Sequence, residues 1–139
     1  MRFVWITLLS LSLTGCATSI VYNPMQVATQ QELLLNENGF KAAQNGMTRT
    51  QVHQIMGDQL VIGYKLQSPD YKPLTIPNPY KTEGGRDAGY LIEYYIQAIR
   101  QPDGIVSDNE LMPLVFKNDK LIGRGWPLAN TVRLPKPTA

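Results

Sequence analysis

A single cysteine, Cys16, stands near the start of this 139-residue chain, so the fold must hold together without an internal disulfide. The residues before it begin with one positive charge, Arg2, and continue with a mostly apolar run from Phe3 to Leu13. That run is too short for a transmembrane helix, which needs roughly 20 apolar residues. A charged start, a short apolar segment and small residues at its end are typical of a secretory signal peptide. We therefore interpret residues 1–15 as a signal peptide.

The tetrapeptide Leu13-Thr14-Gly15-Cys16 resembles a bacterial lipobox. The resemblance implies that the Cys16 thiol carries a diacylglycerol, that cleavage follows Gly15, and that the new amine is acylated. Each buried methylene adds about 0.8 kcal/mol to membrane binding, so several acyl chains hold a protein almost permanently. The alternative is an ordinary buried cysteine near the N-terminus. We expect a lipid-anchored protein whose covalent lipid on Cys16 is its only attached group, with no other cofactor.

The composition of the remaining chain excludes several classes of function. Removing the first 15 of 139 residues leaves 124, which is enough for one domain with an adequate core. Losing Arg2 from the 13 basic residues leaves twelve against 11 acidic ones, so the net charge is near zero. Without a Lys/Arg cluster, nucleic acid is not an expected partner. With Cys16 lipidated, catalysis by cysteine and thiolate metal sites are both excluded.

The first part of the mature chain is predicted to be a tether followed by a helix. Residues 16–26 show no sustained period, and we interpret them as the lipidated tether. An apolar stripe that includes Val27, Leu33 and Leu34 then predicts a helix somewhere within 27–44. One compact domain is expected over residues 27–126.

A second helix is predicted over residues 48–56. Thr48 is a good N-cap, and Gln51, three residues further on, completes a capping box. The apolar residues Val52, Ile55 and Met56 fall on one face. Gly57 ends the helix, and Gly46 suits the end of the helix before it.

Strand patterns fill the second half of the domain. Alternation predicts strands at 59–66 and 90–97, and a hairpin of strands 111–117 and 120–126 that turns at Asn118-Asp119. One face of the second strand is uniformly apolar or aromatic and is expected to lie against the helices: Tyr90, Ile92, Tyr94 and Ile96.

Prolines mark the irregular segments. Pro113 suggests an edge or a bulge near its strand. Four prolines and three glycines make a regular element improbable between the first two strands, and we expect a long loop over residues 68–87. Residues 127–139 are expected to form a proline-containing tail.

The order of lipid anchor, two helices and antiparallel sheet, with Gly46-Met47-Thr48 opening the second helix, resembles the SmpA/OmlA (BamE-like) group of small outer-membrane lipoproteins. The other matching residues are Gln51-Val52, Ile55-Met56-Gly57, the strand from Tyr90 to Ile96 and the segment from Leu111 to Phe116. The ending "FKNDKLIGRGW" is similar to less characterised lipoproteins related to that group. The long loop 68–87 and the Trp126-Pro127 ending depart from the pattern.

The resemblance implies an α+β fold in which two short N-terminal helices pack on a three- to four-stranded antiparallel sheet. It gives Gly46, Met47, Thr48 and Gly57 structural roles as the family motif. It also implies an outer-membrane location facing the periplasm. Ala17 after the cysteine agrees, because aspartate at that position is the usual signal for retention in the inner membrane of enteric bacteria.

No set of catalytic groups emerges from the sequence, and we expect a protein that is not an enzyme. The only histidine, His53, has no carboxylate after it at helical spacing, so we expect an exposed residue and no metal site. Asp103, Asp108 and Glu110 lie close together but lack the alternation of a calcium-binding loop, which favours a solvated hairpin loop. No phosphate-binding loop and no Gly-x-Ser-x-Gly hydrolase motif occur.

The remaining candidate is a protein-interaction surface on the sheet. Tyr95, Glu93, Arg124 and Trp126 are expected on the sheet face that the helices leave uncovered. Tyrosine, tryptophan and arginine anchor many protein interfaces, so Tyr95, Arg124 and Trp126 are candidate partner-binding residues. Alternatively, Tyr95 and Trp126 cover the sheet edge or pack beneath the long loop. The favoured function is an accessory or scaffold lipoprotein of an envelope protein complex. The alternative is a periplasmic binding module for lipid, peptidoglycan or an inhibitory protein.

Overall fold

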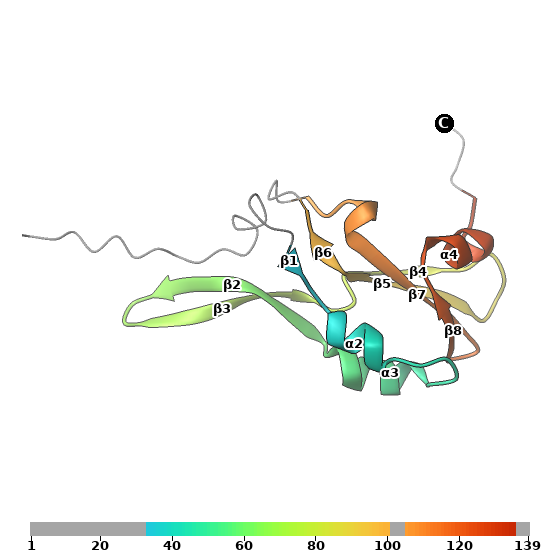
Figure 1. The fold of residues 1–139 in the computed structure, drawn as a ribbon, viewed down its shortest axis with the longest axis horizontal. Helices are drawn as coiled ribbons and strands as arrows, with labels where there is room; N and C mark the ends of the chain where they lie inside the picture. The colour runs from blue at the N-terminus through green and yellow to red at the C-terminus, as the bar shows by residue number, and fades with distance from the viewer. Residues whose placement is uncertain (1–32, 101–104, 136–139) are drawn as a thin grey trace, which may run out of the picture.

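The computed structural model describes residues 33–100 and 105–135, and these residues form an α+β fold (Figure 1). Two short helices come first, antiparallel strands follow, and a further helix ends the described chain. The elements are β1 (Leu33–Leu34), α2 (Glu37–Ala42), α3 (Arg49–Met56), β2 (Gln59–Gln67), β3 (Asp70–Pro77), β4 (Lys81–Gly84), β5 (Tyr90–Ile96), β6 (Ala98–Ile99), η1 (Asp108–Glu110), β7 (Leu111–Lys117), β8 (Lys120–Arg124) and α4 (Trp126–Val132).

A four-stranded antiparallel sheet in the order β4-β5-β7-β8 forms the centre of the domain. The predicted hairpin is confirmed as β7 and β8. Asn118 and Asp119 at its turn both have positive φ, 49° and 67°, as the tight turns that match strand twist require. The pairing of β7 with β8 shifts at Val115/Phe116, so an irregularity does lie near Pro113. The Pro113 carbonyl accepts a hydrogen bond from the Gly125 N–H at 2.8 Å, just past the end of β8.

The two N-terminal helices pack together on one side of this sheet. The predicted capping box of α3 is confirmed, because Thr48 and Gln51 bond each other's backbone N–H groups. Gly57 ends α3 with φ of 76°. Val52 and Met56 are buried as expected, whereas Ile55 is exposed, because the contact with the sheet covers only part of the helix face.

The first helix is shorter than the predicted stripe. Of the described residues 33–44, only 37–42 are helical, and Leu33–Leu34 forms β1, which pairs with β6; Val27 lies outside the described residues. The prediction for Leu33 and Leu34 was therefore wrong. Asn36, with φ of 56°, separates the strand from the helix and donates from its side chain to the Ile96 carbonyl at 2.9 Å.

The helices lie on the opposite face of β5 from the one predicted. They pack against Tyr95, Leu114 and Phe116, together with the partly buried Leu91. Tyr90, Ile92, Tyr94 and Ile96 belong to a second core on the other side of the sheet. The apolar face of β5 was wrongly predicted to be the one that the helices cover. The face that they do cover contains the charged residue Glu93, which can be buried there because Arg49 and His53 of α3 bond to it.

Helix α4 covers that second core. Ala129 and Val132 are buried in it, beside Ile92 and Tyr94. Residues 127–132 therefore belong to the domain, whereas the sequence predicted a tail from 127 to 139. Pro127 does not prevent the helix, because it stands in the first turn, where its missing N–H would have no partner in the helix anyway.

The segment predicted as a loop, 68–87, contains strands, so that prediction was wrong. Residues 70–77 form β3, which pairs with β2 in a two-stranded antiparallel sheet, and residues 81–84 form β4 at the edge of the main sheet. Figure 1 shows the β2–β3 hairpin extending away from the body, on the side opposite α4. Its prolines are accommodated because most of β3 has only one neighbouring strand.

Candidate interaction surface

The partner-binding face predicted from the sequence does not form. Tyr95 is buried beneath the helices, on the opposite side of the sheet from Trp126. The Trp126 ring packs 5.5 Å from the Tyr94 ring, and its Nε1 donates to the Leu111 carbonyl at 3.1 Å. The guanidinium of Arg124 donates to main-chain carbonyls of the segment containing α2, including that of Ala43 at 3.3 Å. Tyr95 and Trp126 thus pack on opposite sides of the sheet and Arg124 bonds to the α2 segment, so the three residues do not share one surface.

Glu93 is the most unusual group in the core, because it is a carboxylate with no exposed surface. Arg49 Nε donates to its Oε1 at 2.5 Å, and the Tyr95 hydroxyl donates to its Oε2 at 2.8 Å. His53 Nε2 lies 2.9 Å from both oxygens. A buried carboxylate of this kind needs such partners, since an unpaired one would be strongly destabilising. Burial, followed by the negative charge of Glu93, raises the pKa of Tyr95.

This cluster joins α3 to β5, and its groups bond to one another, which does not favour a catalytic role. Both carboxylate oxygens already have donors, and the His53 side chain is only 27% exposed, so the prediction of an exposed histidine was wrong. One sequence signal could have found the cluster. Arg49 and His53 lie four residues apart on one helix face, and Glu93 is the single charge in an apolar strand.

The other groups considered from the sequence are not assembled into a site. Within the described ranges, no three His, Cys, Asp or Glu side chains are placed to hold a metal ion. Glu110 is buried and accepts the backbone N–H groups of Arg100 at 2.7 Å and Ser107 at 2.9 Å, so it organises its own loop. Asp103 lies outside the described residues.

The segment Gly46-Met47-Thr48, for which the sequence predicted a structural role, bonds to β8. The Gly46 N–H donates to the Leu121 carbonyl at 2.7 Å, and the Leu121 N–H donates to the Met47 carbonyl at 2.8 Å. Thr48 forms a bridge with Lys120. This stretch therefore lies along the outer side of β8 and closes that edge of the sheet before α3 begins.

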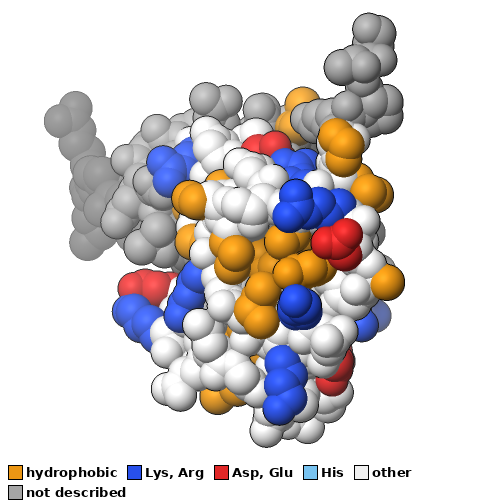
Figure 2. Space-filling view, turned by 90° about the vertical axis from the view of Figure 1, so that its right-hand side faces the viewer, with side chains coloured by type: hydrophobic (Ala, Val, Ile, Leu, Met, Phe, Trp, Pro, Cys, Tyr) orange, Lys and Arg blue, Asp and Glu red, His pale blue; other side chains and the backbone are white. Residues whose placement is uncertain are grey.

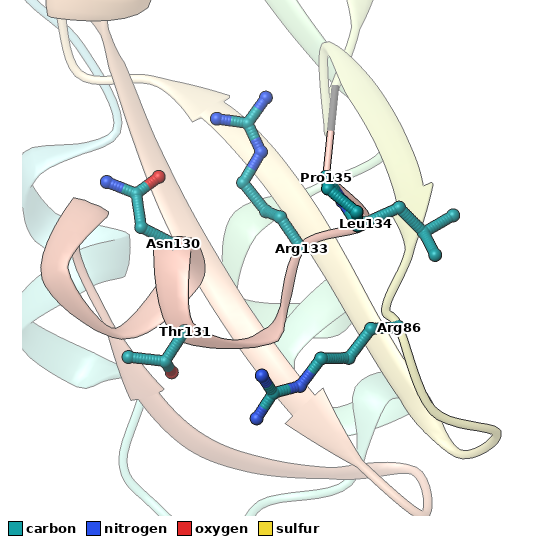
Figure 3. A pocket seen from close by; sticks show the side chains of 6 residues that line it. All are labelled: Arg86, Asn130, Thr131, Arg133, Leu134 and Pro135. Carbon is teal, nitrogen blue, oxygen red and sulfur yellow. The ribbon is translucent and has the colours of Figure 1, made fainter. Parts of the chain in front are cut away.

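A shallow groove of about 610 Å³ lies between the C-terminal end of α4 and the segment after β4. It is lined by Arg86, Asn130, Thr131, Arg133, Leu134 and Pro135. Figure 3 shows the guanidinium groups of Arg86 and Arg133 pointing to different sides. Each faces an acid, Arg86 at 3.8 Å from Asp87 and Arg133 at 3.6 Å from Glu83. On the side of the molecule that carries α4, hydrophobic side chains gather among lysines and arginines (Figure 2).

The β2–β3 hairpin presents the strongest candidate surface. Every side chain of β3 is exposed except that of Ile76, which is half-buried. Tyr71 is 51% exposed, Leu66 39% and Leu74 40%, and Val61 is exposed as well. Leu66 and Tyr71 are direct partners across the two strands, so their side chains share one face. Large apolar groups thus face solvent on a thin projection.

The base of the hairpin is fixed firmly to the body. Leu60 and Ile76 pack against the core under α4. Asn78, just after β3, is buried, and its side-chain amide donates to the Met56 carbonyl at 2.8 Å and to Asn36 Oδ1 at 3.0 Å. The projection therefore starts from a defined position between α3 and the main sheet.

Among the described residues, no helix is both long and apolar enough to cross a membrane. The signal peptide 1–15, the lipid-attachment residue Cys16 and the tether 16–26 all lie outside the described residues.

No protein-family model, curated protein sequence or solved structure matches this chain.

Proposed function

We propose that this chain is a non-enzymatic lipoprotein, anchored through Cys16, that serves as an accessory or scaffold component of an outer-membrane protein complex. The resemblance to the SmpA/OmlA group suggests the location, on the periplasmic face of the outer membrane. The observation that carries the proposal is the β2–β3 hairpin, where the cross-strand pair Leu66 and Tyr71 is exposed on a projection from the body.

Exposed apolar groups on such a projection favour a protein partner. A two-stranded hairpin is marginally stable on its own in water, so a contact that covers one face would stabilise it. Contiguous apolar surface on a soluble domain usually marks an interaction site. A lipid anchor would confine both partners to one membrane, which raises their effective concentration and lets a modest contact suffice.

The absence of enzymatic activity is part of the proposal. Glu93, the one carboxylate paired with a histidine in the core, is fully occupied by donors from Arg49 and Tyr95 as well as His53. A general base needs a free position within reach of a substrate proton. The cluster is therefore better suited to joining α3 to the sheet than to catalysis.

Site-specific crosslinking in native membranes tests the scaffold function. A photoreactive residue placed at Leu66 or Tyr71 should give a discrete crosslink to an outer-membrane assembly component. The same group at Ile122, an exposed position on β8 in the main sheet, is the matched control and should give at most a faint product. Equal labelling from all three positions, or crosslinks to lipid alone, would contradict a scaffold role for the hairpin.

The groove beside α4 favours a second candidate function, binding of an anionic envelope molecule such as a phospholipid. Its lining includes two guanidinium groups, which point to different sides, together with an amide and a hydroxyl. Vesicles containing phosphatidylglycerol should then bind the domain at least threefold better than vesicles of neutral lipid. The double substitution Arg86→Gln and Arg133→Gln should abolish that preference, whereas Lys72→Gln on the hairpin should leave it unchanged.

A further inference from the structure

The strand edges of this molecule are not equally available for pairing. In the main sheet, the outer side of β8 is covered by residues 46–48 through backbone hydrogen bonds to Leu121. At the other edge, the chain after β4 bonds to the end of α4, where Gly85 bridges Arg133. In the described chain, no further strand pairs with the outer side of β4 or with either outer edge of the β2–β3 hairpin, and the hairpin edges are the longer ones, at nine and eight residues against four.

The two edges of the hairpin carry different backbone chemistry. β3 contains Pro73 and Pro77, which have no N–H to donate, and prolines on an edge strand discourage further pairing. β2 contains no proline along its length, Gln59–Gln67. Its pairing with β3 shifts at Val61/Gly63, near the base, and is regular from Gly63 to Gln67. The distal half of β2 is therefore the intact edge.

The side chains around this edge would suit an apolar strand. Residues 59–77 contain three charged residues: Asp70 at the start of β3, and Lys65 and Lys72, which are cross-strand partners next to the pair Leu66 and Tyr71. Leu66 and Tyr71 form an exposed apolar pair on one face of the distal half. A partner strand lying beside β2 would bring alternate side chains onto this face, and an uncharged segment would avoid the cost of burying a charge there.

We infer that the free edge of β2, from Gly63 to Gln67, accepts an extended, uncharged polypeptide segment of a partner protein as a third strand of the hairpin. Main-chain hydrogen bonds supply the attachment, and the pair Leu66 and Tyr71 selects apolar side chains on one face. The inference rests on the proposed scaffold function, since it specifies the kind of partner that the hairpin binds.

Hydrogen–deuterium exchange of the purified full-length protein tests this inference. The probe is a nine-residue peptide of alternating threonine and valine with a lysine at each end. We expect saturable binding, with amide exchange in the segment 63–67 slowed at least fivefold and exchange in β3 and β4 little changed. The control peptide has N-methylated valines, which cannot donate to a strand, and should not bind.

Two substitutions at matched positions provide a second readout. Leu66 on β2 and Leu74 on β3 have almost the same exposure, 39% and 40%, so changing either should preserve the fold. Leu66→Ser should weaken peptide binding at least fivefold, whereas Leu74→Ser, on the other strand and the other face, should leave binding within twofold of the parent protein.

Four results would overturn the inference. They are slowed exchange in β3 or β4 in place of β2, equal binding of the N-methylated peptide, equal effects of the two serine substitutions, and self-association that protects β2 without any peptide. The last result would make a second copy the occupant. If the hairpin crosslinks to a protein in membranes but does not bind the peptide, strand addition is wrong and the scaffold function stands. If the peptide binds but no crosslink forms, the scaffold function is wrong and strand addition stands.

Discussion

His53 Nε2 lies 2.9 Å from each carboxylate oxygen of Glu93, a residue 40 positions further along the chain. The contact links α3 to the middle of β5, at a point where the carboxylate has no access to solvent. Arg49 approaches the same carboxylate from one turn earlier in the helix. A single acidic residue thus fixes how the helix lies on the sheet.

Removing this carboxylate should destabilise the domain. Glu93→Ala would leave the Tyr95 hydroxyl without its acceptor and create a cavity beneath α3. We expect the free energy of unfolding to fall by about 3 kcal/mol, as for other broken buried ion pairs. Urea unfolding followed by circular dichroism measures the change. Glu37→Ala, which breaks an exposed pair with Lys41, is the control and should cost less than about 1 kcal/mol.

Alkaline pH should weaken the fold through its buried tyrosines. Burial raises the pKa of Tyr94 and of Tyr95 above the ordinary value of 10.0, with the nearby carboxylates of Glu83 and Glu93 adding to the effect. The folded state therefore keeps these protons longer than the unfolded chain does. Their stabilisation is complete below pH 10 and is lost as the pH rises above 10.

Unfolding measured between pH 8 and 11 checks this prediction. The free energy of unfolding should be nearly constant up to about pH 9.5 and then fall with increasing slope as unfolded tyrosines ionise. Tyr94→Phe should make that fall shallower, whereas Tyr71→Phe on the exposed hairpin should not. A slope unaffected by either substitution would show that other groups control the alkaline transition.

The N-cap of α3 should contribute measurably to stability. The Thr48 side chain accepts the Gln51 N–H at 3.2 Å, and the Gln51 side chain accepts the Thr48 N–H at 2.9 Å. We expect Thr48→Ala to lower the free energy of unfolding by about 1 kcal/mol. Thr50→Ala, two residues into the same helix and exposed, should change it by less than about 0.5 kcal/mol. Equal effects of the two substitutions would argue against the capping box.

Helix α4 should behave as part of the domain and not as a tail. Val132 is buried against the core of the main sheet, whereas Asn130 in the same helix is exposed. We expect Val132→Ala to lower the free energy of unfolding by about 2 kcal/mol through lost burial and a residual cavity. Asn130→Ala should have little effect in the same urea titration. If neither substitution changes the free energy of unfolding, α4 does not pack as described.

Local chemistry alone was enough to predict several elements. Thr48 and Gln51 meet within one turn of helix, and Asn118-Asp119 needs only its own tolerance of positive φ to reverse the chain. The strand periods of β2, β5, β7 and β8 were likewise visible in short windows. The α+β class, with two N-terminal helices on an antiparallel sheet, was implied by the resemblance to the SmpA/OmlA group, and the structure shows that arrangement.

The candidate site was much less predictable. Tyr95, Arg124 and Trp126 were assigned to a surface because of their residue types, yet the helices and α4 cover opposite sides of the sheet. The β2–β3 hairpin was not predicted, for a different reason. Its prolines suggested a loop, and only the pairing of residues 70–77 with 59–67 makes that segment a strand.

The amino-acid sequence by itself determined the caps, turns and strand periods, because each depends on interactions between residues close together in the chain. Tertiary structure alone decided which face of β5 the helices cover, that Arg49 and His53 pair with Glu93, and where α4 packs. Those outcomes depend on burial and charge compensation between distant segments. A buried carboxylate looks like a surface residue until the groups that pair with it are brought within hydrogen-bonding distance.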